Sequence, residues 1–351
     1  MGIHVISMCA ILAIIPLYWL PVLPDLHIVW LLIAAGIALS VQQRKWLRFS
    51  GLALLFMCWG ILAAQESVWQ MNYLTQAPQQ TEVVITATDG ATMHQGRIVS
   101  LNGERVWAAM GVALYGNYLP QNVCVGQRWA MTLRLRAVHG ELNDGGYDSQ
   151  KNAFARHQTL SGRFTHAALV DEGCSLRAQY LTSLQNTLSA YQWGPVILGL
   201  GMGERLSVSR EIKNLMRDTG TMHLMAISGL HIALAASVIW FLARGIQFFL
   251  PGRWIIWQIP LLAGLIFAAF YAWLTGLQPP ALRTVIALVV LAALKMSGHQ
   301  WSPWQVWLTC VAAILIFDPL AVLSQSLALS AFAVAALIFW YQWLPLPHWQ
   351  R

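Results

Sequence analysis

Charged residues are scarce in this sequence: Asp, Glu, Lys and Arg make up 10% of its 351 residues, against about 25% in a typical soluble domain. Hydrophobic residues make up 57% of the chain. So little charge excludes an ordinary soluble enzyme, and so much hydrophobicity excludes a disordered or collagen-like chain. The composition instead predicts a multi-pass α-helical membrane protein, with the lipid bilayer as one of its partners.

The motifs of several catalytic and nucleotide-binding sites are also missing. The sequence contains no G-x-x-x-x-G-K-[ST] P-loop, and its Gly-rich run at 199–203 has neither the lysine nor an expected preceding strand. It contains no H-E-x-x-H, C-x-x-C or G-x-S-x-G motif, and its ten His form no metallo-hydrolase cluster. We therefore expect no catalytic residues, no cofactor and no metal site; if the protein moves something, the energy must come from outside this polypeptide.

Apolar stretches close to the length of about 20 residues that crosses a bilayer occur in two blocks. The first block holds three and the second holds five: 2–24, 26–43 and 49–65, then 219–243, 254–282, 283–298, 301–317 and 319–343. The sequence thus predicts eight spans. The short apolar run at 193–203 leaves an odd number open, because it has the length of a re-entrant segment.

The basic residues between the spans predict the orientation. Arg44, Lys45 and Arg48 lie between the second and third spans, whereas the turn between the first two carries no basic residue. Basic loops stay in the cytoplasm, so both termini are expected to be cytoplasmic and residues 66–192 external. The same orientation puts most basic residues of the second block inside: Arg244, Arg253, Lys295 and Arg351.

Residues 66–192 show the alternation of β-strands and no long apolar stretch. Strands are expected at 81–88, 95–101, 104–110, 129–138 and 162–170, with a hairpin turn at Asn102-Gly103. These strands predict a small β-rich domain, either a barrel or a sandwich, with an OB-like barrel as one candidate. Residues 174–191 are expected to form a helix on the membrane face.

Charge within the external segment is balanced. Residues 65–192 hold nine Lys and Arg and nine Asp and Glu, whereas residues 193–351 hold nine basic and four acidic residues. The basic excess therefore lies in the membrane portions, where it sets topology. A polyanion-binding stripe would give the external segment a basic surplus, so the balance argues against one.

Two of the five cysteines are candidates for a disulfide. Cys9, Cys58 and Cys310 lie in apolar spans, where a thiol behaves as a small hydrophobic group. Cys124 and Cys174 are the two cysteines of the external segment, which the predicted topology puts in an oxidising compartment. We expect them to pair; the alternative is two unpaired buried thiols.

The start of the fourth span is unusually polar. His223, Ser228, Gly229 and His231 lie within an otherwise apolar run, and polar groups in spans generally face a bundle interior or a water-filled cavity. Helix packing and a transport path both remain open as explanations. The two His are eight residues apart, which is too far for a metal pair on adjacent helical turns.

The run His223–His231, His-Leu-Met-Ala-Ile-Ser-Gly-Leu-His, resembles the most specific motif of the ComEC family, the inner-membrane DNA-uptake channels of naturally transformable bacteria. Other elements are also similar to those of the family: Gly203-Glu204-Arg205, Pro280–Arg283, Asp318-Pro319, the run starting at Gln325, and Gly145–Asp148 with Gly162-Arg163 in the external segment. The run 326–330 departs from the usual family spelling. The resemblance covers nearly the whole chain.

The resemblance implies uptake of single-stranded DNA through a bacterial inner membrane, with 1–65 as three helices, 66–192 as a periplasmic OB-like domain and 193–351 as the competence-type helical domain. A separate DNA receptor and an ATP-driven DNA-translocating protein are the implied partners; the oligomeric state is left open. The residues expected along the path are His223, Ser228, Gly229, His231 and Arg283, as polar lining and not as catalysts.

Members of the family usually continue into more helices and a nuclease-like domain, whereas this sequence stops at Arg351. We therefore expect a truncated member without nuclease activity. Two rival functions remain: a transporter for a small solute, and a fragment that has no function of its own.

Overall fold

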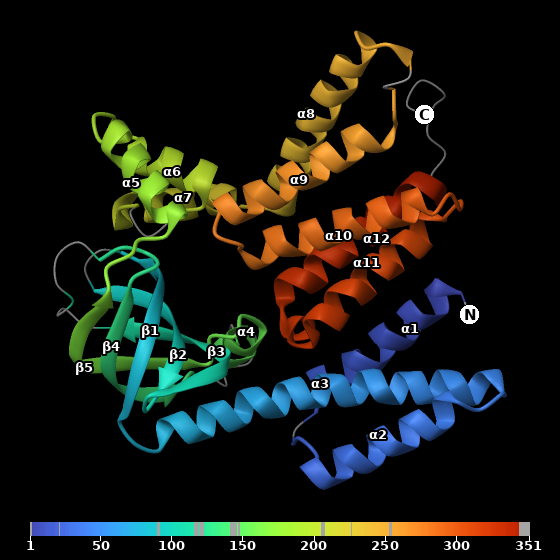
Figure 1. Ribbon diagram of the computed structural model, residues 1–351, viewed down its shortest axis with the longest axis horizontal. Coiled ribbons are helices and arrows are strands. Elements are labelled where there is room, and N and C mark those ends of the chain that lie inside the picture. Colours follow the sequence, from blue (N-terminus) through green and yellow to red (C-terminus); the bar gives the residue numbers. More distant parts are fainter. Residues whose placement is uncertain are drawn as a thin grey trace. The chain divides into compact units, whose positions relative to one another are not determined.

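The computed structural model describes residues 2–20, 22–89, 92–115, 119, 123–140, 146, 148–204, 208–225, 227–252 and 255–343 (Figure 1). The chain divides into two compact units. The helical unit comprises 1–65, 229–272 and 279–351, and the barrel unit comprises 66–228 and 273–278. The sequence assigns 193–228 to the second helical domain, but these residues pack with the barrel unit.

The helical unit contains most of the apolar helices. Its elements are α1 (Ile3–Ile14) with η1 (Ile15–Tyr18), α2 (Leu26–Ser40), the first part of α3 (Lys45–Thr75), α8 (Gly229–Phe248), most of α9 (Gln258–Leu274), α10 (Pro279–Met296), α11 (Pro303–Phe317), η4 (Pro319–Leu323) and α12 (Gln325–Trp343). Within the described residues, α3, α8, α10 and α12 are long and apolar enough to cross a membrane, and four further apolar helices are shorter. Each of these eight helices overlaps one of the predicted spans, although several of the bounds differ.

Small residues allow the helices of this unit to approach closely. A Cβ on Gly51 of α3 would lie 2.6 Å from the carbonyl oxygen of Gly36 in α2, so this contact requires glycine. Elsewhere α1 packs against α11, and α10 packs against both α11 and α8 (Figure 1). The buried Ser7 hydroxyl of α1 donates to Thr309 Oγ1 of α11 at 3.5 Å. The bundle thus buries a few polar groups in pairs.

The predicted span over 219–243 is wrong in its first part. Gly220 has φ +69° and ends α7, η2 (Thr221–Met225) follows, and α8 begins only at Gly229. An uncharged sequence predicts a continuous helix here, but the chain turns at Gly220 and forms a short 3-10 helix before α8. The fifth expected span is likewise divided, because α10 begins at Pro279, where proline suits the first turn of a helix.

The barrel unit holds five strands in a closed barrel. They are β1 (Gln79–Thr88), β2 (Met93–Leu101), β3 (Glu104–Tyr115), β4 (Arg128–Ala137) and β5 (Leu160–Asp171), in the order β1-β2-β3-β5-β4. Adjacent strands are antiparallel except β3 and β5, which pair in parallel. The short helix α4 (Ser149–Ala155) connects β4 to β5. The structure therefore selects a barrel over a sandwich.

Alternation explains how these strands close around a core. Val83, Ile98, Val112 and Leu133 point inward and are fully buried, and Leu74 from the last turn of α3 joins them. At the predicted hairpin, Asn102 and Gly103 have φ values of 51° and 89°, which a type I′ turn requires at both central positions.

The remaining helices of the barrel unit follow β5. They are α5 (Leu176–Leu188), α6 (Gly194–Met202) and α7 (Arg210–Asp218). A disulfide joins Cys124, before β4, to Cys174, directly before α5, with Cα atoms 5.8 Å apart. This is the pairing that the sequence predicts. The backbone N–H of Ser175 also donates to the Val125 carbonyl at 2.9 Å, so the start of α5 is attached to the barrel twice.

Removal of the disulfide should destabilise the barrel unit. The two cysteines are separated by 50 residues, and closing a loop of that length stabilises a fold by about 4 kcal/mol. Cys124→Ser and Cys174→Ser should lower the free energy of unfolding equally, and the double variant should be no worse. Hydrogen exchange of the β1–β5 amides measures this, with Cys9→Ser as a control that leaves exchange unchanged. Ready thiol labelling of both cysteines in the native, unreduced chain would contradict the prediction.

Candidate functional site

In the polar passage singled out in the sequence, residues 221–225 form the short 3-10 helix η2, and the α-helix α8 begins only at Gly229. His223 lies in η2 and is exposed, and its Nδ1–H donates to the Gly220 carbonyl at 2.8 Å. Met225 and Ile227 are buried, whereas Ser228 is half-buried. The passage is thus anchored by its apolar residues and leaves the His223 ring accessible.

Glycines of α6 make room for these anchors. A Cβ on Gly199 would lie 2.6 Å from the Met225 methyl carbon, and one on Gly203 would lie 3.1 Å from Ile227 Cγ1. Gly203 also ends α6 with φ +74°, a conformation that glycine adopts without strain. Close packing against Ile227 and the positive φ thus both explain why the Gly-Glu-Arg element begins with glycine. Arg205 of the same element lies outside the described residues.

Arg177 of α5 connects this region to the α9–α10 turn. Its Nε donates to the Leu274 carbonyl at 2.7 Å, and its Nη2 donates to the Met202 carbonyl at 3.3 Å. These carbonyls lie at the ends of α9 and α6, where helices leave their last carbonyls without an intrahelical partner and carry partial negative charge. One guanidinium thus caps two helices.

The surroundings of Arg177 are tightly shaped. A Cβ on Gly276 would lie 3.2 Å from the guanidinium carbon, and Thr275 beside it is fully buried. Gly276 and Leu277 both have positive φ, 85° and 50°, and such a φ is uncommon for a residue as large as leucine. Burial lowers the pKa of Arg177, and the nearby Glu204 carboxylate opposes that shift. Glu204, the second residue of the Gly-Glu-Arg element, therefore supports the cation.

Three further motif positions lie together in the helical unit. Arg283, in the first turn of α10, donates from Nη2 to Ser326 Oγ at 2.8 Å and from Nη1 to Ser324 Oγ at 3.4 Å. Gln325 begins α12 between these two serines, so the Pro-x-x-Arg and Gln-Ser elements meet. Asp318 lies at the end of α11, where its backbone N–H donates to the Ile314 carbonyl.

Gly229 and His231 begin α8 in the same unit. A Cβ on Gly229 would lie 2.4 Å from Thr284 Oγ1 of α10, so this close approach requires glycine. His231 is half-buried. The predicted path residues are therefore divided: His223 and Ser228 belong to the barrel unit, whereas Gly229, His231 and Arg283 belong to the helical unit.

Sequence reasoning missed Arg177. Its helix was expected, but nothing in a single sequence distinguishes this arginine from the other basic residues of the external segment. The signal lies in its partners, the backbone carbonyls 25 and 97 residues away. As for metals, no group of three or more His, Cys, Asp or Glu side chains is placed to hold an ion within the part of the chain that the structure describes.

Comparison with known proteins identifies the class. A family model described as Competence protein matches residues 200–351, which include the polar passage and α8–α12. The chain belongs to the competence protein (ComEC) family. No solved structure matches it.

Similar proteins are found in several bacteria. The chain is 59% identical over 350 residues to Uncharacterized protein YcaI of Escherichia coli, covering 100% of this chain and 46% of that protein. It is 31% identical to Recombination protein 2 of Haemophilus influenzae (90% and 38% covered) and 32% identical to Competence protein ComA of Neisseria gonorrhoeae (79% and 41%). The chain thus spans less than half the length of these relatives.

Replacing Arg177 should loosen the ends of α6 and α9. Arg177→Met removes both hydrogen bonds and leaves two carbonyls without donors, which should cost about 2–3 kcal/mol of unfolding free energy. Arg177→Lys should recover only part of the lost free energy. Its ammonium can donate to one carbonyl but cannot span both as the planar guanidinium does. Hydrogen exchange at 198–204 and 272–278 measures the effect, with the exposed Arg97→Met as the matched control. Equal exchange in the two methionine variants would contradict the double capping role.

Proposed function

We propose that the chain forms part of a single-stranded DNA uptake channel in a bacterial inner membrane. The observation that carries this proposal is the passage His223–His231, which lies within the region matched by the competence family model. It is not one continuous α-helix, because the 3-10 helix η2 ends at Met225 and the apolar helix α8 begins only at Gly229. Non-helical backbone beside a span is tolerated where it is buried in protein or lines a water-filled cavity. A path for a polar polymer needs such a lining.

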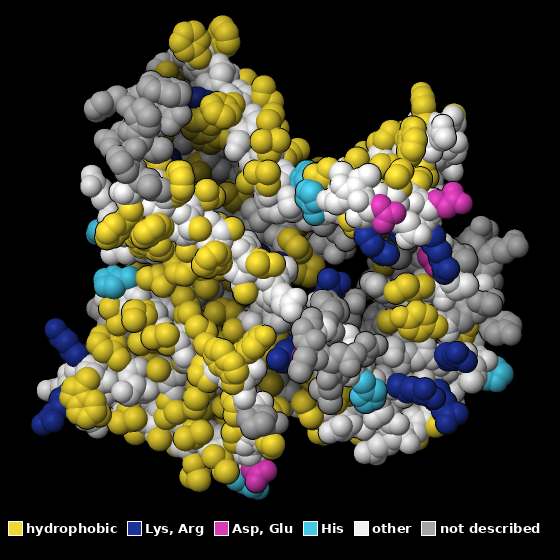
Figure 2. Space-filling model, turned by 180° about the vertical axis from the view of Figure 1, so that it is seen from behind, with side chains coloured by type: hydrophobic (Ala, Val, Ile, Leu, Met, Phe, Trp, Pro, Cys, Tyr) yellow, Lys and Arg dark blue, Asp and Glu magenta, His cyan; other side chains and the backbone are white. Residues whose placement is uncertain are grey.

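The surface of the helical unit supports the membrane location. Figure 2 shows hydrophobic side chains gathered over its helices. On α8 and α12 large side chains are widely exposed, including Leu230 at 73%, Phe241 at 67% and Phe332 at 74%. Soluble monomers rarely expose contiguous apolar patches beyond a few hundred Å², whereas lipid tails cover such a surface at no cost. We take the eight apolar helices as spans.

The external location of residues 66–192 rests on charge and cysteine chemistry. The basic loop with Arg44 and Lys45 is assigned to the cytoplasm, as are both termini, and three spans then bring α3 out on the periplasmic side. Disulfides persist in oxidising compartments, which agrees with the Cys124–Cys174 bridge. The five-stranded closed order β1-β2-β3-β5-β4 is that expected of an OB-like barrel.

The residues proposed to line the path are His223, Ser228, Gly229, His231 and Arg283. Of these, Arg283 also ties α10 to the start of α12, so its role includes holding the helices that would border the path. With no P-loop in its sequence, the chain depends on an ATP-driven DNA-translocating protein, and a separate receptor delivers the DNA. Two relatives named for recombination and competence support this assignment.

Reporter fusions test the topology. A periplasm-active phosphatase fused after Gln76, just beyond α3, should be active, and a cytoplasm-active fluorescent protein fused there should be dark, because three spans precede it. Fusions after Arg44 are the matched control and should give the opposite pattern. Fluorescence from the Gln76 fusion without phosphatase activity would overturn the orientation.

An uptake assay tests the function. In the host, deletion of the gene should leave labelled DNA in the periplasm and abolish its DNase-protected entry into the cytoplasm. Gly229→Ala should reproduce much of that loss, because the added Cβ would lie 2.4 Å from Thr284 Oγ1. Adding Thr284→Ala removes that oxygen and should restore entry, with Thr284→Ala alone as the control. Unchanged cytoplasmic entry in the deletion strain would rule out the proposed function.

A further inference from the structure

Three arginines gather on one outer face of the barrel. Arg134 and Arg136 of β4 alternate with the buried Leu133 and Leu135, so both point outward, and Arg163 of β5 precedes the buried Phe164. All three arginines are exposed. We call Arg134, Arg136 and Arg163 the arginine face.

The strand register brings two of these cations together. Arg134 and Arg163 are directly paired in the β4–β5 ladder, and Arg136 pairs with Ser161 at the next outward position. Like charges placed opposite each other destabilise a sheet. Among the residues that the structure describes, the ion pairs join Arg128 to Glu82 and Asp171, and Lys151 to Asp148. None of these pairs neutralises the arginine face.

The position of these arginines matters more than the net charge of residues 65–192, which is zero. Nine basic and nine acidic residues in 65–192 argue against a polyanion-binding stripe, but that count ignores position. Two acidic side chains of this sheet, Glu82 and Asp171, are engaged with Arg128, which pairs with Asp171 at the far end of the same ribbon. Figure 2 shows Lys and Arg side chains grouped on the barrel. The fold thus places the arginine face apart from these two acidic residues, although the external segment holds equal numbers of basic and acidic residues.

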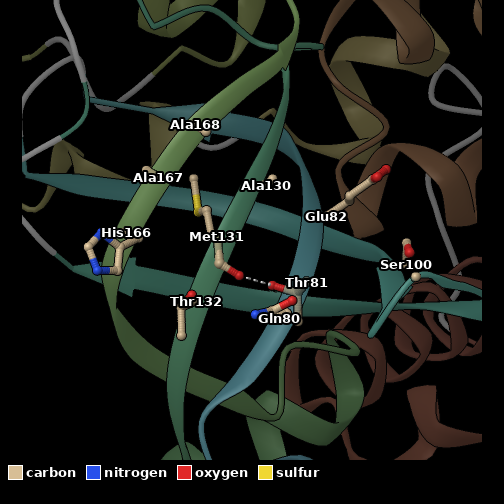
Figure 3. Close-up of a pocket in the computed structure, with 11 residues that line it drawn as sticks. Gln80, Thr81, Glu82, Ser100, Ala130, Met131, Thr132, His166, Ala167 and Ala168 are labelled. Atoms are coloured by element: carbon tan, nitrogen blue, oxygen red, sulfur yellow. Dashed lines mark hydrogen bonds between the residues drawn. The ribbon is translucent and has the colours of Figure 1, made fainter.

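A shallow hollow continues from the arginine face along the same ribbon. It has a volume of about 370 Å³ and lies across β1, β4 and β5 (Figure 3). His166 is paired with Thr132, and Ala168 with Ala130, on its floor. Ala130 lies four residues before Arg134, roughly 13 Å along an extended strand. Most of the residues that line the hollow carry short, uncharged side chains.

We propose that the arginine face binds the phosphate backbone of a single nucleic-acid strand, whose sugars and bases pass over the hollow. This inference rests on the proposed function, because it assigns that function's substrate to a surface. Guanidinium groups bind phosphate oxygens in bidentate fashion, and an anion between Arg134 and Arg163 relieves their repulsion. Among the described lining residues His166 carries the one ring, so recognition falls on the backbone and is independent of sequence.

A lipid headgroup has the same phosphate chemistry, but the neighbours of the arginine face favour the nucleic acid. Surfaces that dock on anionic membranes combine basic residues with exposed apolar side chains. Here the outward neighbours are Ser161, Thr132, Thr165 and His166, which are polar. Membrane docking is therefore treated as an alternative outcome of the experiment.

The test uses the full chain in nanodiscs of neutral lipid and a fluorescent oligothymidylate of 20 nucleotides. The variant Arg134→Gln/Arg136→Gln/Arg163→Gln should weaken binding about tenfold or more, and the slope of log K against log salt should become shallower by about 2, since each phosphate contact on a single strand contributes roughly 0.7. Arg97→Gln/Arg105→Gln, on β2 and β3, is the matched control and should keep most of the affinity. A methylphosphonate oligothymidylate, which lacks backbone charge, should bind weakly to every form.

A second measurement separates binding from folding. Arg163→Gln removes the opposed pair, so its thermal midpoint should equal or exceed that of the parent chain while its affinity for the oligonucleotide falls. Equal oligonucleotide binding by the triple variant and the parent would overturn the inference. So would a triple variant that loses only its flotation with phosphatidylglycerol vesicles, because the arginines would then serve the membrane.

The two proposals fail separately. If deletion of the gene abolishes DNA entry but the triple variant restores entry and binds oligonucleotide like the parent, only the arginine face is rejected. If deletion leaves entry unchanged, the uptake function is rejected whatever the binding data show.

Discussion

The two hydrogen bonds from Arg177 are the interaction on which the candidate site depends. They join α5 to the last carbonyls of α6 and α9, across 25 and 97 residues of sequence. Helix ends need such donors, and a cation also suits their partial negative charge. The Cys124–Cys174 bridge fixes the chain three residues before Arg177. The disulfide therefore attaches α5 to the barrel, and Arg177 attaches α5 to the ends of α6 and α9. Together they explain why the turn 273–278, between two apolar helices, belongs to the barrel unit.

Around Arg177, packing and backbone conformation explain why particular residue types occupy the family's motif positions. Gly203 and Gly276 both have positive φ, and each lies against a neighbour that a side chain would displace, Ile227 in one case and Arg177 in the other. Glu204 favours the charged form of Arg177 against burial. In the helical unit, Gly229 accommodates Thr284 and Arg283 holds two serines at the start of α12. Close backbone approach and capping thus account for the residue types at these motif positions.

Some of this structure follows from sequence alone because the relevant physics is local. Apolar length locates the eight helices, alternation locates the strands, and Asn102-Gly103 specifies its turn through its own φ preferences. The start of α8 does not follow, because the passage before it depends on the burial of Met225 and Ile227 against distant parts of the chain. Arg177 could not be found either, since its partners are backbone carbonyls that any sequence possesses. Such contacts leave no composition signal.

The arginine face lies between these two cases. The spacing of Arg134 and Arg136 already puts them on one side of a strand, since side chains two residues apart share a face. What sequence lacks is the register: a bulge at Thr132/Leu133 shifts β5 so that Arg163, and not a neutral neighbour, faces Arg134. A one-residue slip would turn Arg163 inward and expose Phe164. The core that buries Phe164 therefore enforces the repulsion outside, and a surface charge pattern that costs stability is held in place by the packing beneath it.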